Sequence, residues 1–169
     1  IIGPGGMGKT RFSLAFAEQC LGLTATHYPD GVYFVTLTNV NPIPEMAVSD
    51  QISLAINQGL GLTPEWGGVS AGLPKQQLLD YLRPRRLLLI LDNFEHLQHG
   101  HLLLAELHQA APLIRLIVTS RERLNLYEER IFRLTGLTLP QLDEVPRAGT
   151  SSRLGRAWQL STLAQAEAV

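Results

Sequence analysis

Residues 3–10 of the chain have the sequence GPGGMGKT, and this stretch decides the fold. It fits the pattern G-x-x-x-x-G-K-[ST] without a mismatch. Glycines permit positive φ angles and carry no Cβ, so the backbone N–H groups can curl around a phosphate. A helix beginning near Lys9 would point the positive end of its dipole at that phosphate. The alternative is a glycine-rich turn before a helix, but a strand end on one side and a helical pattern on the other favour a phosphate-binding loop.

The loop predicts a role for each of its polar residues. Lys9 supplies a compact positive charge to the β- and γ-phosphates, so it counts as both a binding and a catalytic residue. Thr10 supplies a hydroxyl oxygen to Mg²⁺. The predicted cofactor-binding residues of this stretch are Gly3, Pro4, Gly5, Gly6, Met7, Gly8, Lys9, Thr10 and Arg11.

Outward from the loop, short apolar runs alternate with longer helical patterns, which indicates an α/β fold with a parallel sheet. The first helix carries Phe12, Ala15, Phe16 and Gln19 at helical spacing. The run at 87–91 is continuously apolar and predicts a fully buried central strand. The expected strands are 1–2, 32–38, 87–91, 113–118 and 130–134, and the expected helices are 11–21, 45–58, 75–82 and 102–111.

Composition excludes several classes of protein. The 169 residues are 45% hydrophobic and 17% charged, which excludes an intrinsically disordered chain. No apolar run approaches the ~20 residues of a membrane helix, so no membrane partner is expected. A net charge of −1 gives no general attraction to nucleic acid, so no direct nucleic-acid binding is expected. The single cysteine, Cys20, excludes an internal disulfide and favours a cytoplasmic location.

A partner acid for the loop is expected where the central strand ends, at Asp92. There the carboxylate would hold Mg²⁺ directly or through water, whereas the simpler interpretation is a residue that caps the next helix. The following residue, Asn93, cannot act as a base. Glu95 is the nearest acid that could orient the attacking water, and its alternative is a solvent-facing position in the first turn of a helix.

A second strand end predicts a sensor of the phosphate. Residues 116–121 read LIVTSR, and Arg121 at the end of this strand can point at the γ-phosphate. We therefore place Arg121 among the catalytic residues. Its alternative is a surface salt bridge with Glu122 or Glu128.

These pieces together resemble the STAND class of P-loop ATPases, and most closely the NB-ARC-like module of large bacterial regulators of the LuxR and SARP types. The matching segments are GPGGMGKT at 3–10, VYFVTL at 32–37, LLLILDNFEHL at 87–97, IVTSRERL at 117–124 and RLTGLTLP at 133–140. The resemblance implies a three-layer fold whose mainly parallel five-stranded sheet has the order 5-1-4-3-2. It also implies binding of ATP or ADP, with Pro140 near the adenine, and an ATP-driven switch that acts on a homo-oligomer or on neighbouring domains.

The resemblance covers residues 1–142, which we expect to form the P-loop domain with a truncated first strand. Residues 143–169 depart from the family pattern and are expected to be a divergent or poorly ordered tail. The expected function is an ATP-binding switch domain of a larger signalling or transcriptional regulator, with slow Mg²⁺-dependent hydrolysis. The alternatives are a nucleotide-binding scaffold without turnover and a P-loop kinase that acts on a small molecule.

Overall fold

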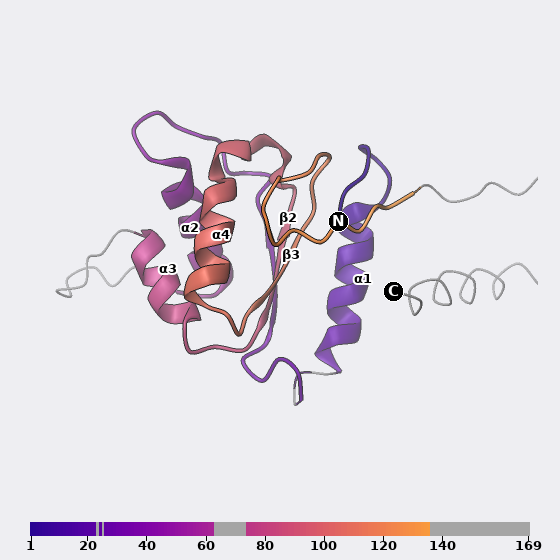
Figure 1. Cartoon of the computed structure of the whole chain (residues 1–169), viewed down its shortest axis with the longest axis horizontal. Coiled ribbons are helices and arrows are strands. Elements are labelled where there is room, and N and C mark those ends of the chain that lie inside the picture. The colour runs from indigo at the N-terminus through magenta and orange to yellow at the C-terminus, as the bar shows by residue number, and fades with distance from the viewer. Residues whose placement is uncertain (23, 25, 63–73, 136–169) are drawn as a thin grey trace, which may run out of the picture. The chain divides into compact units, whose positions relative to one another are not determined.

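The fold is organised around its central strand, β2 (Leu88–Asp92), which lies between β1 (Val32–Thr36) and β3 (Arg115–Val118) in one parallel sheet. In the register of the sheet, Thr36 lies beside Asp92, and Leu91 lies beside Val118. The carboxyl ends of all three strands therefore meet at one edge, as parallel pairing requires. The computed structural model describes residues 1–22, 24, 26–62 and 74–135, all within the unit Ile1–Gly136 (Figure 1).

Two isolated parallel bridges extend the pattern beyond β3. Ile2 pairs with Ser120 on one side and with Arg133 on the other. Hydrogen bonds run from Ile2 N to Phe132 O at 2.8 Å and from Leu134 N to Ile2 O at 2.8 Å. The segment 130–134 thus contributes a single bridge where a fifth strand was expected. These positions are compatible with the order 5-1-4-3-2, which stays a prediction because three strands are formed in the described residues.

Helices cover both faces of the sheet, which gives three layers. Figure 1 shows α1 (Lys9–Leu21) on one face, and α2 (Val48–Gly59), α3 (Pro74–Leu82) and α4 (His101–Ala110) on the other. Two short 3-10 turns, η1 (Phe94–His96) and η2 (Gln98–Gly100), connect β2 to α4. The order of helices and strands agrees with the α/β architecture predicted from the sequence.

The apolar run at 87–91 forms the buried centre that was predicted. All five residues of β2 are buried. Because side chains alternate across a strand, Leu89 and Leu91 join the core beneath α2, α3 and α4, while Leu88 and Ile90 pack against α1. One strand therefore holds the two helical layers together.

The residues at helical spacing in the sequence do not form the buried face of α1. Ala15, Phe16 and Gln19 are exposed, and the residues buried against the sheet are Ser13, Ala17 and Cys20. Small side chains let the helix approach β2 closely, so size rather than hydrophobicity decides which face is inside. Phe12 is half-buried, and its ring stacks on Phe132 with centroids 5.2 Å apart.

Several predicted boundaries differ from the observed ones. The second expected strand ends at Thr36 and not at residue 38, and the strand expected at 113–118 begins at Arg115. The helix expected at 45–58 begins at Val48, because the stretch before it forms turns held by the Gln51 side chain. The amide oxygen of Gln51 accepts a hydrogen bond from Ile43 N. Its amide nitrogen donates to Ile43 O and, at 2.7 Å, to Met46 O.

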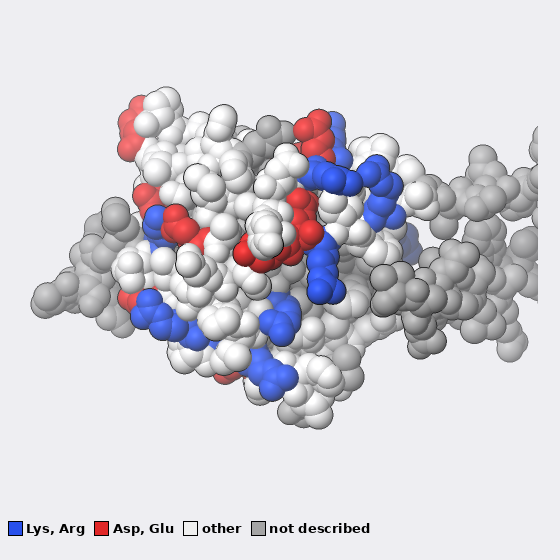
Figure 2. Space-filling view, viewed as in Figure 1, with Lys and Arg blue, Asp and Glu red and all other residues white. Residues whose placement is uncertain are grey.

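Within the described residues, no helix is long and apolar enough to cross a membrane. The face drawn in Figure 2 carries acidic and basic side chains close together. Pro140 and the segment 143–169 lie outside the described residues, as does most of the expected loop at 59–72.

Candidate functional site

The loop at residues 3–10 has the backbone that its glycines predict. Gly6 and Gly8 adopt positive φ angles of 76° and 85°, a region that favours glycine. Gly8 precedes the first turn of α1, and its carbonyl accepts the N–H of Phe12 at 2.8 Å. Gly3 is needed for a different reason, because a Cβ there would lie 2.9 Å from the carbonyl oxygen of Leu134.

Lys9 folds back over the loop from the start of α1. Its ammonium group donates to the carbonyl oxygen of Gly3 at 2.7 Å and to that of Pro4 at 3.0 Å. The loop therefore carries a positive charge on its inner side, next to the N–H groups of the first helical turn. Those N–H groups have no acceptor within the helix, so the arrangement is suited to an anion.

Thr10 joins the loop to the central strand. Its hydroxyl lies 3.0 Å from Oδ1 and 2.9 Å from Oδ2 of Asp92, at the carboxyl end of β2. Asp92 is 4% exposed and also accepts a 2.6 Å hydrogen bond from the hydroxyl of Thr119. The two predicted Mg²⁺ ligands, which are 82 positions apart in sequence, are therefore direct neighbours.

The donor set around Asp92 fits Mg²⁺. A buried carboxylate is costly unless a cation or several hydrogen bonds balance it. In the part of the chain that the structure describes, no lysine or arginine forms an ion pair with Asp92. Its neighbours are hydroxyl oxygens, and oxygen ligands from one or two protein groups are what Mg²⁺ takes beside a nucleotide.

The chain turns sharply after Asp92. Asn93 adopts a left-handed conformation, with φ 67° and ψ 53°, and η1 follows directly. Glu95 thus lies in a 3-10 turn and not in the first turn of an α-helix, and its side chain is 21% exposed. The turn brings this acid back toward the carboxyl edge of the sheet, where it can reach the end of β3.

Arg121 forms an ion pair with Glu95, a partner that the sequence did not suggest. Its Nε lies 2.7 Å from Oε2 of Glu95. The contact is an ion pair, since the buried Oε2 accepts no hydrogen bond within the described residues. The guanidinium also borders the loop, because a Cβ added at Gly5 would lie 3.8 Å from Cζ of Arg121.

An open hollow of about 330 Å³ lies at this edge of the sheet. It is lined by Glu95, His96, Ser120, Arg121 and Glu122. The wall of the hollow is tied to the loop, because Gly3 N donates to Ser120 O at 3.3 Å. His96 is held from outside by a 2.8 Å contact between its Nε2 and Val40 O. The site thus combines a loop suited to phosphate with a polar hollow beside it.

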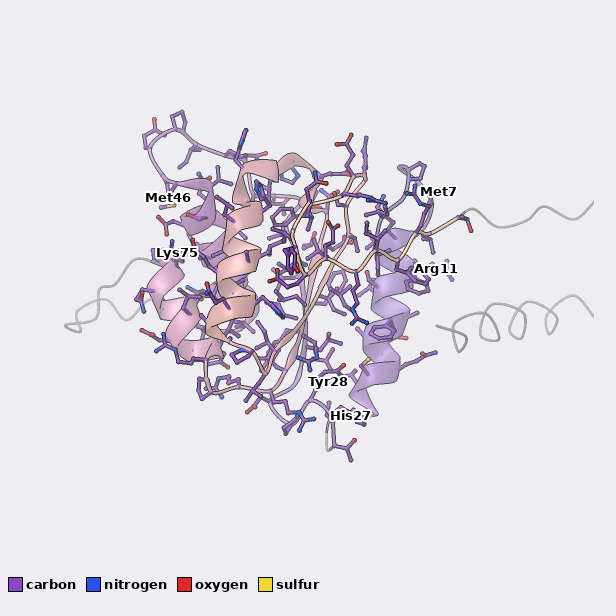
Figure 3. All side chains as sticks on the ribbon, viewed as in Figure 1. Met7, Arg11, His27, Tyr28, Met46 and Lys75 are labelled. Carbon is purple, nitrogen blue, oxygen red and sulfur yellow. The ribbon has the colours of Figure 1, made fainter. Side chains whose placement is uncertain are left out.

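Two other predicted residues lie at the rim of the site. Met7 is half-buried in the loop, and Arg11 is exposed and extends away from the sheet (Figure 3). Pro140, predicted near the adenine, lies outside the described residues. Sequence reasoning missed Thr119, whose hydroxyl contacts Asp92. Its position directly after an apolar strand, as with Asp92 itself, was the signal that could have identified it.

Comparisons with known proteins found similar proteins in mycobacteria. The chain is 31% identical over 140 residues to a protein of Mycobacterium tuberculosis (strain H37Rv) named "Putative HTH-type transcriptional regulator" and to its counterpart in Mycobacterium bovis. An uncharacterized protein of Mycobacterium tuberculosis is 29% identical over the same length. The match covers 82% of this chain in each case, but only 14% of the regulators and 32% of the third protein. The chain therefore spans about one seventh of the length of the regulators it matches.

No protein-family model matches the chain. Among solved structures, the ORC2 protein of Aeropyrum pernix, described in ADPNP-ADP complexes, aligns with a TM-score of 0.46 and 19% identity. The alignment covers 71% of this chain and 33% of that one.

Proposed function

We propose that the chain is an ATP-binding switch domain of the STAND class, with slow Mg²⁺-dependent hydrolysis, within a larger signalling or transcriptional regulator. The observation that carries the proposal is the contact between Thr10 and Asp92 at 2.9–3.0 Å. A glycine-rich turn without a nucleotide would not require a buried acid at this point. The mycobacterial relatives named as regulators support the wider context.

The loop would hold the phosphates through its backbone N–H groups, and Lys9 would add its charge. At present the Lys9 ammonium is satisfied by two loop carbonyls at 2.7 and 3.0 Å, which hold it at the place where a phosphate would enter. Thr10 and Asp92 would hold Mg²⁺, which neutralises the charge that develops on the phosphates during transfer.

Arg121 and Glu95 would distinguish ATP from ADP. The Arg121 guanidinium borders Gly5 of the loop and pairs with Glu95. A γ-phosphate offers a stronger anion than one carboxylate, so ATP would draw Arg121 away from Glu95 and release this acid to orient water. ADP has no γ-phosphate and would leave the ion pair closed.

The second candidate, a nucleotide-binding scaffold without turnover, is favoured by one specific observation. Glu95 is the nearest acid to Asp92 along the following turn, and its carboxylate is already occupied by Arg121. If the pair persists with ATP bound, no free base remains on η1. Phosphate release separates the two functions. An ATPase would lose its phosphate release in Asp92→Ala and Glu95→Gln, whereas a scaffold would release no phosphate with or without these substitutions.

The test of nucleotide binding is calorimetry with ATP and ADP in the presence of Mg²⁺. Lys9→Ala removes a charged donor to phosphate, which is typically worth about 1.5–3 kcal/mol, so affinity should fall about 10- to 100-fold. Lys75→Ala is the matched control, because Lys75 is the other lysine and pairs with Glu106 at 3.0 Å on the far side of the sheet (Figure 3). Equal affinities for the two variants would contradict a phosphate-binding loop.

A further inference from the structure

Thr119 occupies a buried position between the two halves of the site. It follows β3 directly and is 1% exposed. Its backbone continues the pairing with β2, because Thr119 N donates to Leu91 O at 3.0 Å. Its side chain is therefore held in place on the Asp92 side of the sheet edge.

The hydrogen bonds of the Thr119 hydroxyl fix the direction of its proton. The backbone N–H of Asn93 donates to Oγ1 at 2.9 Å, so one lone pair is occupied. The hydroxyl proton then points to the other neighbour, Oδ1 of Asp92, at 2.6 Å. A hydroxyl that donates to a carboxylate makes a short and strong hydrogen bond, as this distance shows.

The same residue anchors the turn that carries Glu95. Phe94 N donates to the carbonyl oxygen of Thr119 at 3.0 Å, while Asn93 N donates to its hydroxyl. These two bonds stabilise the left-handed conformation of Asn93 and the start of η1. Thr119 thus contacts the predicted metal ligand on one side and positions the acid-bearing turn on the other.

We propose that Thr119 is the positioning residue that orients the Asp92 carboxylate for Mg²⁺, an inference that rests on the proposed function of the site. With Oδ1 bound to Thr119, the plane of the carboxylate is fixed, and the hydroxyl of Thr10 lies 3.0 Å from Oδ1 and 2.9 Å from Oδ2. Partners that hold a metal-ligating carboxylate typically change metal affinity about 10- to 100-fold when they are removed.

The test compares nucleotide binding with Mg²⁺ and with EDTA, using the whole chain and ADP as the probe. Thr119→Val keeps the shape of the side chain and removes the hydroxyl. In the Thr119→Val variant, the factor by which Mg²⁺ raises the affinity for ADP should be about 10- to 100-fold smaller than in the unaltered chain. Its affinity in EDTA should be unchanged, because the loop itself is untouched. Thr119→Ser keeps the hydroxyl and should retain the gain.

Thr24→Val is the matched control, because the Thr24 hydroxyl bonds Leu21 O at 3.0 Å at the opposite end of α1. If Thr119→Val does not fold, Thr119→Ala and Thr119→Ser make the same comparison, since both lack the methyl group and differ in the hydroxyl alone. A full Mg²⁺ gain in the variants without a hydroxyl would overturn the role of Thr119. Equal losses in Mg²⁺ and EDTA would show a purely structural role and overturn it as well.

The outcomes also separate this proposal from the function on which it rests. If the unaltered chain binds ADP equally with Mg²⁺ and EDTA, the Mg²⁺ site at Thr10 and Asp92 is wrong, and Thr119 has no ligand to orient. If the unaltered chain gains affinity with Mg²⁺ and Thr119→Val gains as much, the site stands and only the role of Thr119 is refuted.

Discussion

Replacing Glu95 with glutamine should raise the affinity for ATP and leave that for ADP unchanged. In the structure, Glu95 Oε2 lies 2.7 Å from Nε of Arg121, and the same guanidinium borders Gly5 of the phosphate loop. To reach a γ-phosphate, Arg121 must give up this partner. Glutamine keeps the size of the side chain and removes the charge that competes with the phosphate, so only the nucleotide with a γ-phosphate benefits.

The size of the effect follows from the exposure of the pair. The Arg121 side chain is 62% exposed, and that of Glu95 is 21% exposed, so water screens much of the attraction. Ion pairs at such sites contribute about 0.2–1 kcal/mol. Glu95→Gln removes this attraction, which competes with the γ-phosphate for Arg121, and the affinity for ATP should therefore rise about 1.5- to 5-fold. The gain should shrink as salt is added, because exposed charges are screened within about 10 Å at 0.1 M.

Competition of ATP and ADP for a fluorescent nucleotide measures both affinities in one titration series. Glu106→Gln is the matched control, because Glu106 also pairs with a basic side chain, Lys75, at 3.0 Å, but on the opposite side of the sheet. Its ratio of ATP to ADP affinity should equal that of the unaltered chain. An equal change for ATP and ADP in Glu95→Gln, or weaker ATP binding, would refute the competition between the carboxylate and the γ-phosphate.

Three further predictions concern the scaffold. Gly100→Ala places a Cβ 2.2 Å from Cδ1 of the fully buried Ile52, so urea unfolding should show a loss of about 1–3 kcal/mol, and an unchanged midpoint would contradict this packing. Leu89→Ala opens a cavity at the centre of the sheet and should cost about 2–5 kcal/mol in the same assay, whereas a change below this range would mean that the core closes around the site. Burial raises the pKa of the Cys20 thiol. A thiol reagent should therefore react slowly with the native chain and rapidly with the chain in denaturant. Equal reaction rates would contradict the burial of Cys20. Since the folded state then holds the proton to a higher pH than the unfolded state, stability should fall as the pH rises above the pKa of an exposed thiol, about 8.5.

The parts of the fold that follow from local sequence were predictable. The phosphate loop is eight consecutive residues whose glycines set the backbone, and α1 begins at Lys9 as the pattern requires. The run at 87–91 is apolar at every position, and only a strand buried on both faces needs that composition. Asp92 then follows as the first polar residue at the edge where parallel strands end.

The approach of Thr10 to Asp92 was predictable from the loop and the strand end, but the contacts of Thr119 and the pair of Arg121 with Glu95 were not. Thr119 and Asp92 are 27 positions apart, and nothing in either segment alone shows that their side chains meet. The pairing of Arg121 with Glu95 depends on the left-handed turn at Asn93, which redirects the chain after β2. Sequence spacing suggested partners near Arg121 along the chain, whereas the fold brings Glu95 to it from the 3-10 turn that follows β2.

The small residues on the buried face of α1 determine how the loop meets the sheet. Ser13, Ala17 and Cys20 are the buried residues of this helix, and Ala17 and Cys20 pack on Leu88 and Ile90 of β2. Larger side chains on this face would lift the helix from the strand. Because α1 starts within the loop, any such displacement would also move its first turn, and the 2.9 Å contact between Thr10 and Asp92 depends on that turn. These small buried residues therefore set the distance on which the candidate metal site depends.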